Sequence, residues 1–399
     1  MSLESDTSNG NQTDAVGLNV EQAVRSRYSQ ASQSTQASLC CPVDYDPKFL
    51  EVLPDEIVER DYGCGDPSKY VRPGETVLDL GSGGGKICYI ASQVVGAEGR
   101  VLGVDMNEDM LALAKKYQDE VSQRIGHSNV EFHRGRIQDL ALDLDRFDKY
   151  LNDNPVKTSD DWVRAQEYAD AQRESEPMIA SDSVDVIVSN CVLNLVRRED
   201  RIQMFREMHR VLKRGGRAVI SDIVCDEQVP ERLQNDPELW SGCISGAFVE
   251  RDFFQTFADA GFYGMEYLVY EKEPWGTVEG IEFRSVTIVA YKGKEGPCLD
   301  HKQAVIYKGP WKAVIDDDGH TLRRGERMAV CEKTFSIYTR APYAEQVLAV
   351  EPNDPVDTQD AKPFDCRRDA VRDPRETKGT NYQLTQLPDD NCCGPSGCC

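Results

Sequence analysis

Residues 77–85 read Val-Leu-Asp-Leu-Gly-Ser-Gly-Gly-Gly, and this stretch decides the fold class. A short apolar strand runs directly into a glycine-rich turn, and a helical pattern begins near Lys86. Glycine suits such a turn because the backbone must bend tightly and let a ligand approach without interference from Cβ atoms. In doubly wound α/β sheets, ligands bind at this first strand-to-helix turn. The stretch therefore predicts an α/β fold with a nucleotide-like cofactor.

The surrounding chain alternates apolar, β-branched segments with helical patterns from about residue 40 to residue 294. Strands are expected at residues 76–81, 100–106, 130–137, 184–190, 217–224 and 283–291. Helices are expected at 107–125 and 199–213, the second ending in the basic, glycine-containing stretch 213–216. This alternation is typical of βαβ units and predicts a doubly wound, mostly parallel sheet.

Two carboxylates near the glycine turn narrow the choice of cofactor. Asp105 follows Gly81 by 24 residues, at the end of the second expected strand, where a carboxylate can accept hydrogen bonds from both ribose hydroxyls. Asp79 lies two residues before Gly81, where its charge would repel a pyrophosphate but attract a cationic amino-acid group. S-adenosylmethionine therefore fits better than NAD, with Ile137 expected to frame the adenine. A plain tight turn and an N-cap role for Asp105 are the alternatives.

Composition excludes several other classes of protein. The 399 residues carry a formal net charge of −23, which disfavours phosphate backbones and anionic lipid head groups as partners. No run of about 18 apolar residues occurs, and the start, Met-Ser-Leu-Glu-Ser-Asp, lacks the features of a secretory signal. We therefore expect a cytoplasmic protein with a small-molecule ligand and no nucleic-acid or membrane partner. In that setting the 14 cysteines indicate metal-binding or redox-active thiols.

Five segments, in order, resemble the arsenite S-adenosylmethionine methyltransferases. They read Tyr-Gly-Cys-Gly at 62–65, Val-Leu-Asp-Leu-Gly-Ser-Gly at 77–83, Gly-Val-Asp-Met at 103–106, Val-Ser-Asn-Cys-Val-Leu-Asn-Leu at 188–195 and Leu-Trp-Ser-Gly-Cys-Ile-Ser-Gly-Ala at 239–247. The similarity covers about residues 40–292, and residues 307–343 resemble the C-terminal domain of many microbial members. The resemblance implies a Rossmann-like class I methyltransferase fold that transfers methyl groups from S-adenosylmethionine to arsenic.

The resemblance also assigns residues to the cofactor. It places S-adenosylmethionine against Asp79, Gly81, Ser82, Gly83, Lys86, Asp105, Met106, Ile137 and Asn190. Lys86 departs from the family pattern, which usually has an arginine here, so a point charge replaces a bidentate contact with a carboxylate.

The resemblance assigns As(III) to three cysteines, Cys64, Cys191 and Cys243. Trivalent arsenic is a soft, pyramidal centre with one lone pair, and thiolates suit it as soft ligands suit soft metals. Cys191 stands at the C-terminal end of an expected strand, the edge toward which the methyl group of the cofactor should point. A buried, purely structural role is the alternative for each of the three.

In the family, a cysteine near the start of the folded region takes part in a disulfide relay. Cys40 and Cys41 both stand there; we assign Cys41 to the relay with Cys64 and keep Cys40 as the alternative. Thioredoxin or glutathione would reset the enzyme, whose substrates would be arsenite and methylated trivalent arsenicals. Capture of thiophilic ions is assigned to Cys40, Cys392, Cys393, Cys398 and Cys399.

Four further cysteines are expected to be structural. Cys88 and Cys225 fall within the predicted fold, and Cys298 and Cys331 fall in an accessory domain, where a plain buried role is favoured over a structural metal.

The chain is predicted to divide into five parts. They are a disordered tail at 1–38, a cofactor-binding domain at 39–225 with a surface insertion at 141–180, an arsenic-binding subdomain at 226–294, an accessory domain at 295–350 and a flexible tail at 351–399. Within the accessory domain, short strands are expected at 306–307, 313–315, 328–330 and 335–338.

Two other functions stay open. The chain could methylate an organic small molecule, with structural cysteines, or it could be a thiol-rich protein that sequesters arsenic or a metal. Stoichiometric, tight As(III) binding would argue against the first, and cofactor binding without turnover would support the second.

Overall fold

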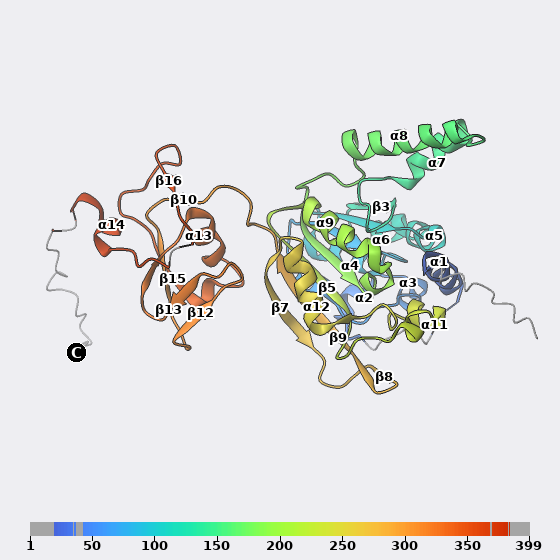
Figure 1. Cartoon of the computed structure of the whole chain (residues 1–399). Coiled ribbons are helices and arrows are strands. Elements are labelled where there is room, and N and C mark those ends of the chain that lie inside the picture. The colour runs from blue at the N-terminus through green and yellow to red at the C-terminus, as the bar shows by residue number, and fades with distance from the viewer. Residues whose placement is uncertain (1–19, 35, 37–42, 368, 382, 384–399) are drawn as a thin grey trace, which may run out of the picture. The chain divides into compact units, whose positions relative to one another are not determined.

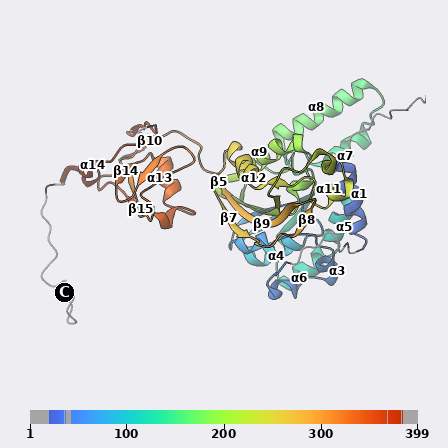
Figure 2. The ribbon, with the colours of Figure 1, turned by 60° about the horizontal axis from the view of Figure 1, so that its bottom comes forward.

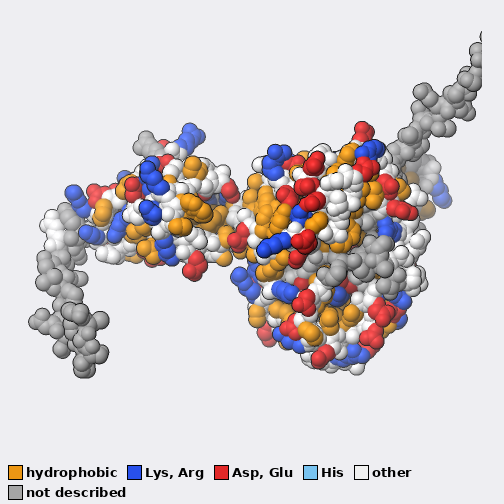
Figure 3. Space-filling view, turned by 90° about the horizontal axis from the view of Figure 1, so that it is seen from below, with side chains coloured by type: hydrophobic (Ala, Val, Ile, Leu, Met, Phe, Trp, Pro, Cys, Tyr) orange, Lys and Arg blue, Asp and Glu red, His pale blue; other side chains and the backbone are white. Residues whose placement is uncertain are grey.

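The computed structural model describes residues 20–34, 36, 43–367, 369–381 and 383. They form two compact units, one reaching Lys292 and the other starting at Gly293 (Figure 1). On the face drawn in Figure 3, acidic and basic side chains are interspersed over the first unit. Within the described ranges, no helix combines the length and apolar character that a membrane crossing requires.

A nine-stranded sheet forms the centre of the first unit. Its main path runs β3-β2-β1-β4-β5-β9-β7. The strands are β1 (Thr76–Leu80), β2 (Arg100–Asp105), β3 (Val130–Arg134), β4 (Val184–Asn190), β5 (Leu212–Cys225), β7 (Tyr263–Tyr270) and β9 (Ile281–Tyr291), with β6 (Phe248–Val249) and β8 (Gly276–Val278) at the side. The first five strands of the path pair in parallel, whereas β9 is antiparallel to both β5 and β7. The predicted mostly parallel α/β sheet is confirmed.

Helices cover both faces of this sheet, so successive residues of β1 enter different cores. Leu78 packs in a core with Phe205 of α9 (Arg201–Val211) and Phe257 of α12 (Glu250–Asp259). Val77 packs on the other face with Ile90 of α4 (Lys86–Val95). Figure 2 shows α9 and α12 on one side of the sheet and α4 on the other. Burial on both faces explains why the strands read as nearly continuous apolar runs.

Several element boundaries differ from those expected. The predicted helix at 107–125 is two helices, α5 (Glu108–Lys116) and α6 (Gln118–Ile125), separated at Tyr117. Strand β3 ends three residues before 137, because the chain turns there and Asp139 N–H donates to Arg136 O at 3.0 Å. Residues 213–216 do not end a helix; they loop out of the pairing between β4 and β5, where Gly215 has a φ of +86°.

Residues 20–34, predicted to belong to a disordered tail, are folded. They carry α1 (Val20–Ala31), which lies beside α5 and α11 (Pro237–Ser241), as Figures 1 and 2 show. Arg27 Nη1 donates to Glu238 O at 2.8 Å and to Ser241 Oγ at 2.7 Å. Val20 and Ala31 are buried. The tail prediction is therefore wrong for this segment, because tertiary contacts stabilise a helix with little apolar surface of its own.

The segment 141–180 forms a helical hairpin of α7 (Leu144–Asp153) and α8 (Ser159–Ser175). The rings of Tyr150 and Tyr168 stack with centroids 4.0 Å apart and join the two helices. A capping box between Thr158 and Asp161 starts α8. Three shorter helices, α2 (Pro47–Leu50), α3 (Asp55–Glu59) and α10 (Glu231–Gln234), complete the first unit.

The second unit is mainly short strands. They are β10 (Leu299–Asp300), β11 (Ala304–Tyr307), β12 (Ala313–Ile315), β13 (Thr321–Arg323), β14 (Arg327–Ala329), β15 (Val347–Val350) and β16 (Lys362–Pro363), with helices α13 (Glu332–Tyr338) and α14 (Pro374–Lys378). The strand predicted at 335–338 is wrong, because these residues lie in α13. A short, mostly apolar segment such as Phe-Ser-Ile-Tyr suits either conformation, and its packing decides between them.

The folded part of this unit also continues beyond 350, where a flexible tail was expected. Strand β16 pairs with β10, and Arg372, which is 5% exposed, forms an ion pair with Asp300 at 2.6 Å. A Pro- and Asp-rich composition indicated disorder, but these long-range contacts hold β16 and Arg372 against β10.

Candidate active site

A cavity opens at the carboxyl ends of β1, β2 and β4. Of the nine residues assigned to the cofactor, all except Lys86 line it: Asp79, Gly81, Ser82, Gly83, Asp105, Met106, Ile137 and Asn190. The cavity therefore lies where ligands bind in open α/β sheets.

The glycine turn is held on the neighbouring strand by backbone hydrogen bonds. The N–H groups of Gly81 and Ser82 donate to Val104 O at 2.8 and 3.1 Å, and Gly83 N–H donates to the Asp105 carboxylate at 2.9 Å. Gly81 has a φ of +70°, and a Cβ there would lie 2.5 Å from Val192. Only glycine fits at position 81 of this turn. The hydrogen bond from Gly83 orients the Asp105 carboxylate.

Asp79 is a buried carboxylate on the cavity wall. It is 2% exposed, and burial raises its pKa to about 7, although a hydrogen bond from the Cys88 thiol at 3.2 Å opposes the shift. No lysine or arginine in the described ranges forms an ion pair with it. The buried Ser82 hydroxyl on the same wall has no hydrogen-bond partner among the described residues. An unpaired carboxylate and a free hydroxyl fit the cationic amino-acid group of S-adenosylmethionine.

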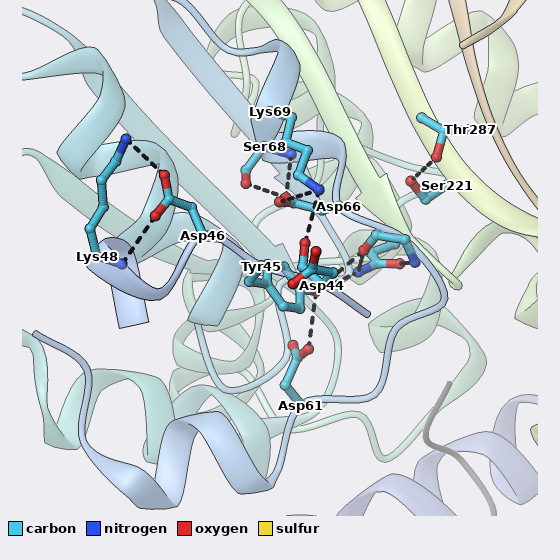
Figure 4. Close-up of polar contacts among 12 residues, drawn as sticks. Asp44, Tyr45, Asp46, Lys48, Asp61, Asp66, Ser68, Lys69, Ser221 and Thr287 are labelled. Atoms are coloured by element: carbon cyan, nitrogen blue, oxygen red, sulfur yellow. Dashed lines mark hydrogen bonds and ion pairs between the residues drawn. The ribbon is translucent and has the colours of Figure 1, made fainter. Parts of the chain in front are cut away.

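Lys86 does not take the place expected for it. Its ammonium group forms an ion pair with Asp61 at 3.0 Å and lies 3.7 Å from the centroid of the Tyr45 ring. The Tyr45 hydroxyl also faces Asp61, at 3.5 Å (Figure 4). Because Lys86 is 6% exposed and absent from the cavity wall, its direct contact with the cofactor is not supported. It neutralises Asp61, which does line the cavity.

The three cysteines assigned to arsenic meet beside this cavity, although 179 residues separate the first from the last. Cys64 and Cys191 form a disulfide with Cα atoms 5.9 Å apart. The Cys243 thiol donates to Cys191 O at 3.2 Å. The Cys191 and Cys243 sulfur atoms and an Asp222 carboxylate oxygen all lie within 4.8 Å of one another.

The relay cysteines are outside the described residues. Cys40 and Cys41 fall there, as do Cys392, Cys393, Cys398 and Cys399. The partner of Cys64 in this structure is Cys191, not the Cys41 or Cys40 that the resemblance implied.

Asn190 joins the two halves of the site. Its Oδ1 accepts hydrogen bonds from the N–H groups of Cys64 at 2.9 Å and Gly65 at 3.1 Å, while its Nδ2 donates to Gly65 O at 2.7 Å. Ser221 and Thr287, hydrogen-bonded to each other at 2.8 Å, lie close by (Figure 4). Asn190 is the last residue of β4 and lines the cavity, so it fixes the Cys64 loop beside the cavity.

Asp222 is a site residue that sequence reasoning missed. It is fully buried and accepts hydrogen bonds from Leu193 N–H at 2.9 Å and the Asn194 side chain at 2.7 Å. Burial raises its pKa to about 7, against the opposing effect of backbone hydrogen bonds such as that from Ile223 N–H. The available signal was a lone acidic residue in an apolar strand, Ala218–Val224.

Helix α1 supplies a second missed part of the site. Glu21, Val24, Arg25 and Tyr28 line the cavity. Burial raises the pKa of the Tyr28 hydroxyl well above its usual value, and the nearby Cys243 adds to this shift. The available signal was weak: apolar residues at 20, 24 and 31, on one helical face.

Two other cysteines are buried away from the cavity wall. Cys88 lies in α4 beneath Asp79, and Cys225 approaches Phe248 O at 3.4 Å. Burial raises the pKa of Cys225 to about 12, so this thiol stays neutral. Both positions agree with the structural role expected for them.

Comparisons with known proteins agree with the fold. A methyltransferase domain model matches residues 72–172 and 165–261, and a domain of unknown function matches residues 294–382. The crystal structure of an arsenic(III) S-adenosylmethionine methyltransferase from Chlamydomonas reinhardtii superposes with a TM-score of 0.53 at 26% identity, covering 82% of this chain and all of that one.

Several similar proteins are named arsenite methyltransferases. An arsenite methyltransferase of Aquipseudomonas alcaligenes is 33% identical over 79% of this chain and 85% of its own length. Arsenite methyltransferases of Mus musculus, 31% identical over 76% of this chain and 74% of their own, and of Homo sapiens, 28% identical over 88% of both, also match. The match to the Aquipseudomonas alcaligenes enzyme exceeds 30% identity and extends over most of both chains, so this chain belongs to the arsenite methyltransferase family.

Proposed function

We propose that this protein transfers methyl groups from S-adenosylmethionine to arsenite. One observation carries the proposal beyond family membership: Cys191 belongs both to the cofactor cavity and to the cluster of Cys64, Cys243 and Asp222. A soft-ligand site and a site for a cationic methyl donor therefore share a wall. Proximity of two bound reactants can supply much of a rate enhancement without other chemistry.

Arsenite binding would use the thiolates of Cys64, Cys191 and Cys243. Each As–S bond replaces an As–O bond, and the thiol proton leaves with hydroxide as water. The disulfide between Cys64 and Cys191 must first accept two electrons, because a disulfide sulfur has no thiolate to offer. Asp222, whose pKa is raised to about 7, is suited to take up a thiol proton near neutral pH and pass it to the departing hydroxide.

Methyl transfer would need no general base. Bound S-adenosylmethionine supplies an electrophilic methyl group, and the lone pair of As(III) is the nucleophile. The residues of the chain therefore act by position: Asp79 and Asp105 hold the cationic and ribose groups, and Asn190 keeps the Cys64 loop beside them.

Each transfer oxidises arsenic by two electrons, which a thiol pair would return while forming a disulfide. We propose that Cys64 takes part, with Cys191 or with Cys41 or Cys40 as its partner, and that thioredoxin or glutathione restores the thiols. A cytoplasmic location would supply these reductants. The expected products are mono- and dimethylated arsenicals.

Arsenic speciation by chromatography with mass detection tests the proposal. Wild-type protein incubated with arsenite, S-adenosylmethionine and a thiol reductant should give methylated arsenic. Cys191→Ser should give none, while the matched control Cys225→Ser, which alters a buried thiol off the cavity wall, should retain activity. Full activity of Cys191→Ser would overturn the thiolate site. Cofactor binding without any methylated product would favour an organic substrate or sequestration.

A further inference from the structure

Three cysteines of the second unit converge on one point. Cys298 precedes β10, Cys331 precedes α13 and Cys366 follows β16, yet their sulfur atoms all lie within 4.8 Å of one another. Pairing of β10 with β16 brings the first and third together, and Phe364 N–H donates to Cys298 O at 2.8 Å. The structure leaves all three as free thiols.

The surroundings of these thiols favour binding of a soft ion. Cys331 is fully buried, and its sulfur accepts a hydrogen bond from Thr334 N–H at 3.4 Å. Cys298 and Cys366 are partly exposed. Cys331 and Cys366 also line a hollow.

We propose that Cys298, Cys331 and Cys366 form a second binding site for trivalent arsenic, separate from the catalytic cysteines. The set is three sulfur atoms, with no histidine nitrogen or carboxylate oxygen among the described residues in the same group. Structural zinc takes four ligands in a tetrahedron, whereas As(III) is satisfied by three soft ligands in a pyramid. Three thiols alone therefore match arsenic better than zinc.

The binding reaction balances without a redox step. Arsenous acid and three thiols give a tris-thiolate complex and three molecules of water, so three As–S bonds replace three As–O bonds. Neither S-adenosylmethionine nor methyl transfer is involved. The site would give the domain of unknown function at 294–382, which contains all three cysteines, a role in arsenic binding.

Protection from alkylation, read peptide by peptide, tests this site in the full chain. Reduced protein is incubated with or without one to two equivalents of arsenite, alkylated briefly with iodoacetamide, digested and analysed by mass spectrometry. We expect arsenite to slow alkylation of Cys298 and Cys366 together, at least tenfold. Cys331→Ser should abolish the protection of both, and Cys366→Ser, which alters a partly exposed residue, should abolish that of Cys298.

Two further arms separate the alternatives. Cys243→Ser should lose methylation yet keep the protection at Cys298 and Cys366, so failure of the proposed function is distinguishable from failure of this inference. Equal alkylation with and without arsenite would overturn the site. So would protection by Zn²⁺ at lower concentration than arsenite, which would indicate a zinc centre, or protection of Cys298 that persists in Cys366→Ser.

Discussion

The Cys243 thiol donates a hydrogen bond to the backbone carbonyl oxygen of Cys191, at 3.2 Å. Both residues have left-handed backbone conformations, with φ of +65° for Cys243 and +59° for Cys191. A side chain with a Cβ costs about 1–2 kcal/mol in this region. Such outliers concentrate at functional sites, and here they occur in the two residues whose sulfur atoms face Asp222.

Replacement of Cys191 should reveal this backbone strain. We expect Cys191→Gly to be more stable than Cys191→Ala by about 1 kcal/mol, because glycine adopts a positive φ without a Cβ clash. Urea unfolding of the two variants measures the difference directly, and both should lack arsenite methylation.

Cys88 is the matched control, since it is also a buried cysteine but lies in helix α4. There the order should reverse, with the glycine variant less stable than the alanine variant by about 1 kcal/mol. The same order at both positions would show that the conformation of Cys191 carries no measurable cost.

Activity should depend on reduction of the disulfide between Cys64 and Cys191. Protein in which these two cysteines are joined should neither bind arsenite at this site nor methylate it, because two of the three sulfur ligands are withheld. Treatment with a thiol reductant should restore both properties, in step with alkylation of the peptides that contain Cys64 and Cys191. Methylation by protein whose disulfide stays intact would contradict the three-thiolate site.

Cofactor affinity should increase with pH around neutrality. Burial raises the pKa of Asp79 to about 7, so below this pH its carboxyl is neutral and attracts a cationic ligand less. We expect S-adenosylmethionine to bind roughly tenfold more tightly at pH 8 than at pH 6, as measured by calorimetry. These two pH values lie about one pH unit above and below the pKa, so the ionised fraction of Asp79 differs roughly tenfold between them. Asp79→Asn should bind weakly and without this dependence.

Asp222→Asn is the control for that titration. Its pKa is also raised to about 7, but Asp222 is absent from the cavity wall, so this variant should keep the dependence of cofactor affinity on pH. If the dependence disappears in Asp222→Asn and persists in Asp79→Asn, the assignment of Asp79 to the cofactor is wrong.

The same carboxyl should lower the stability of the ligand-free protein at high pH. The folded-state pKa of Asp79 lies above its usual value of 3.8, so the folded state holds the proton more tightly than the unfolded state. Stability from this group is therefore lost as pH rises from about 4 to about 7. Thermal unfolding should show Asp79→Asn stabilised relative to wild type by several degrees at pH 8 and by less at pH 5.

Helix α1 should contribute to cofactor binding through its attachment to α11. Arg27→Ala removes the hydrogen bonds to Glu238 and Ser241, so α1 is held less firmly over the cavity that Val24 and Tyr28 line. We expect a several-fold higher Kd for S-adenosylmethionine, with little change in thermal stability. Gln30→Ala alters an exposed residue of the same helix and should bind normally. Equal affinities of the two variants would contradict this role.

Local patterns in the sequence were sufficient for the sheet and the cofactor turn. Strands buried on both faces have continuous apolar runs, and the glycine-rich turn at Gly81 directly follows such a strand, so both can be predicted from adjacent residues. The motifs around Cys64, Cys191 and Cys243 are likewise short and contiguous, so they indicate the family by themselves.

Only the tertiary structure decided which distant residues share a site. Contacts between segments far apart in the chain place Asp222 and helix α1 at the site and bring together Cys298, Cys331 and Cys366. The local pattern of apolar and polar residues does not predict such contacts. For the same reason, Lys86 was expected at the cofactor but pairs with Asp61. Helix α1, strand β16 and helix α14 fall in segments that were expected to be tails. Local sequence determines the conformation of a segment where its own burial pattern is strong; where it is weak, the partners supplied by the fold determine it.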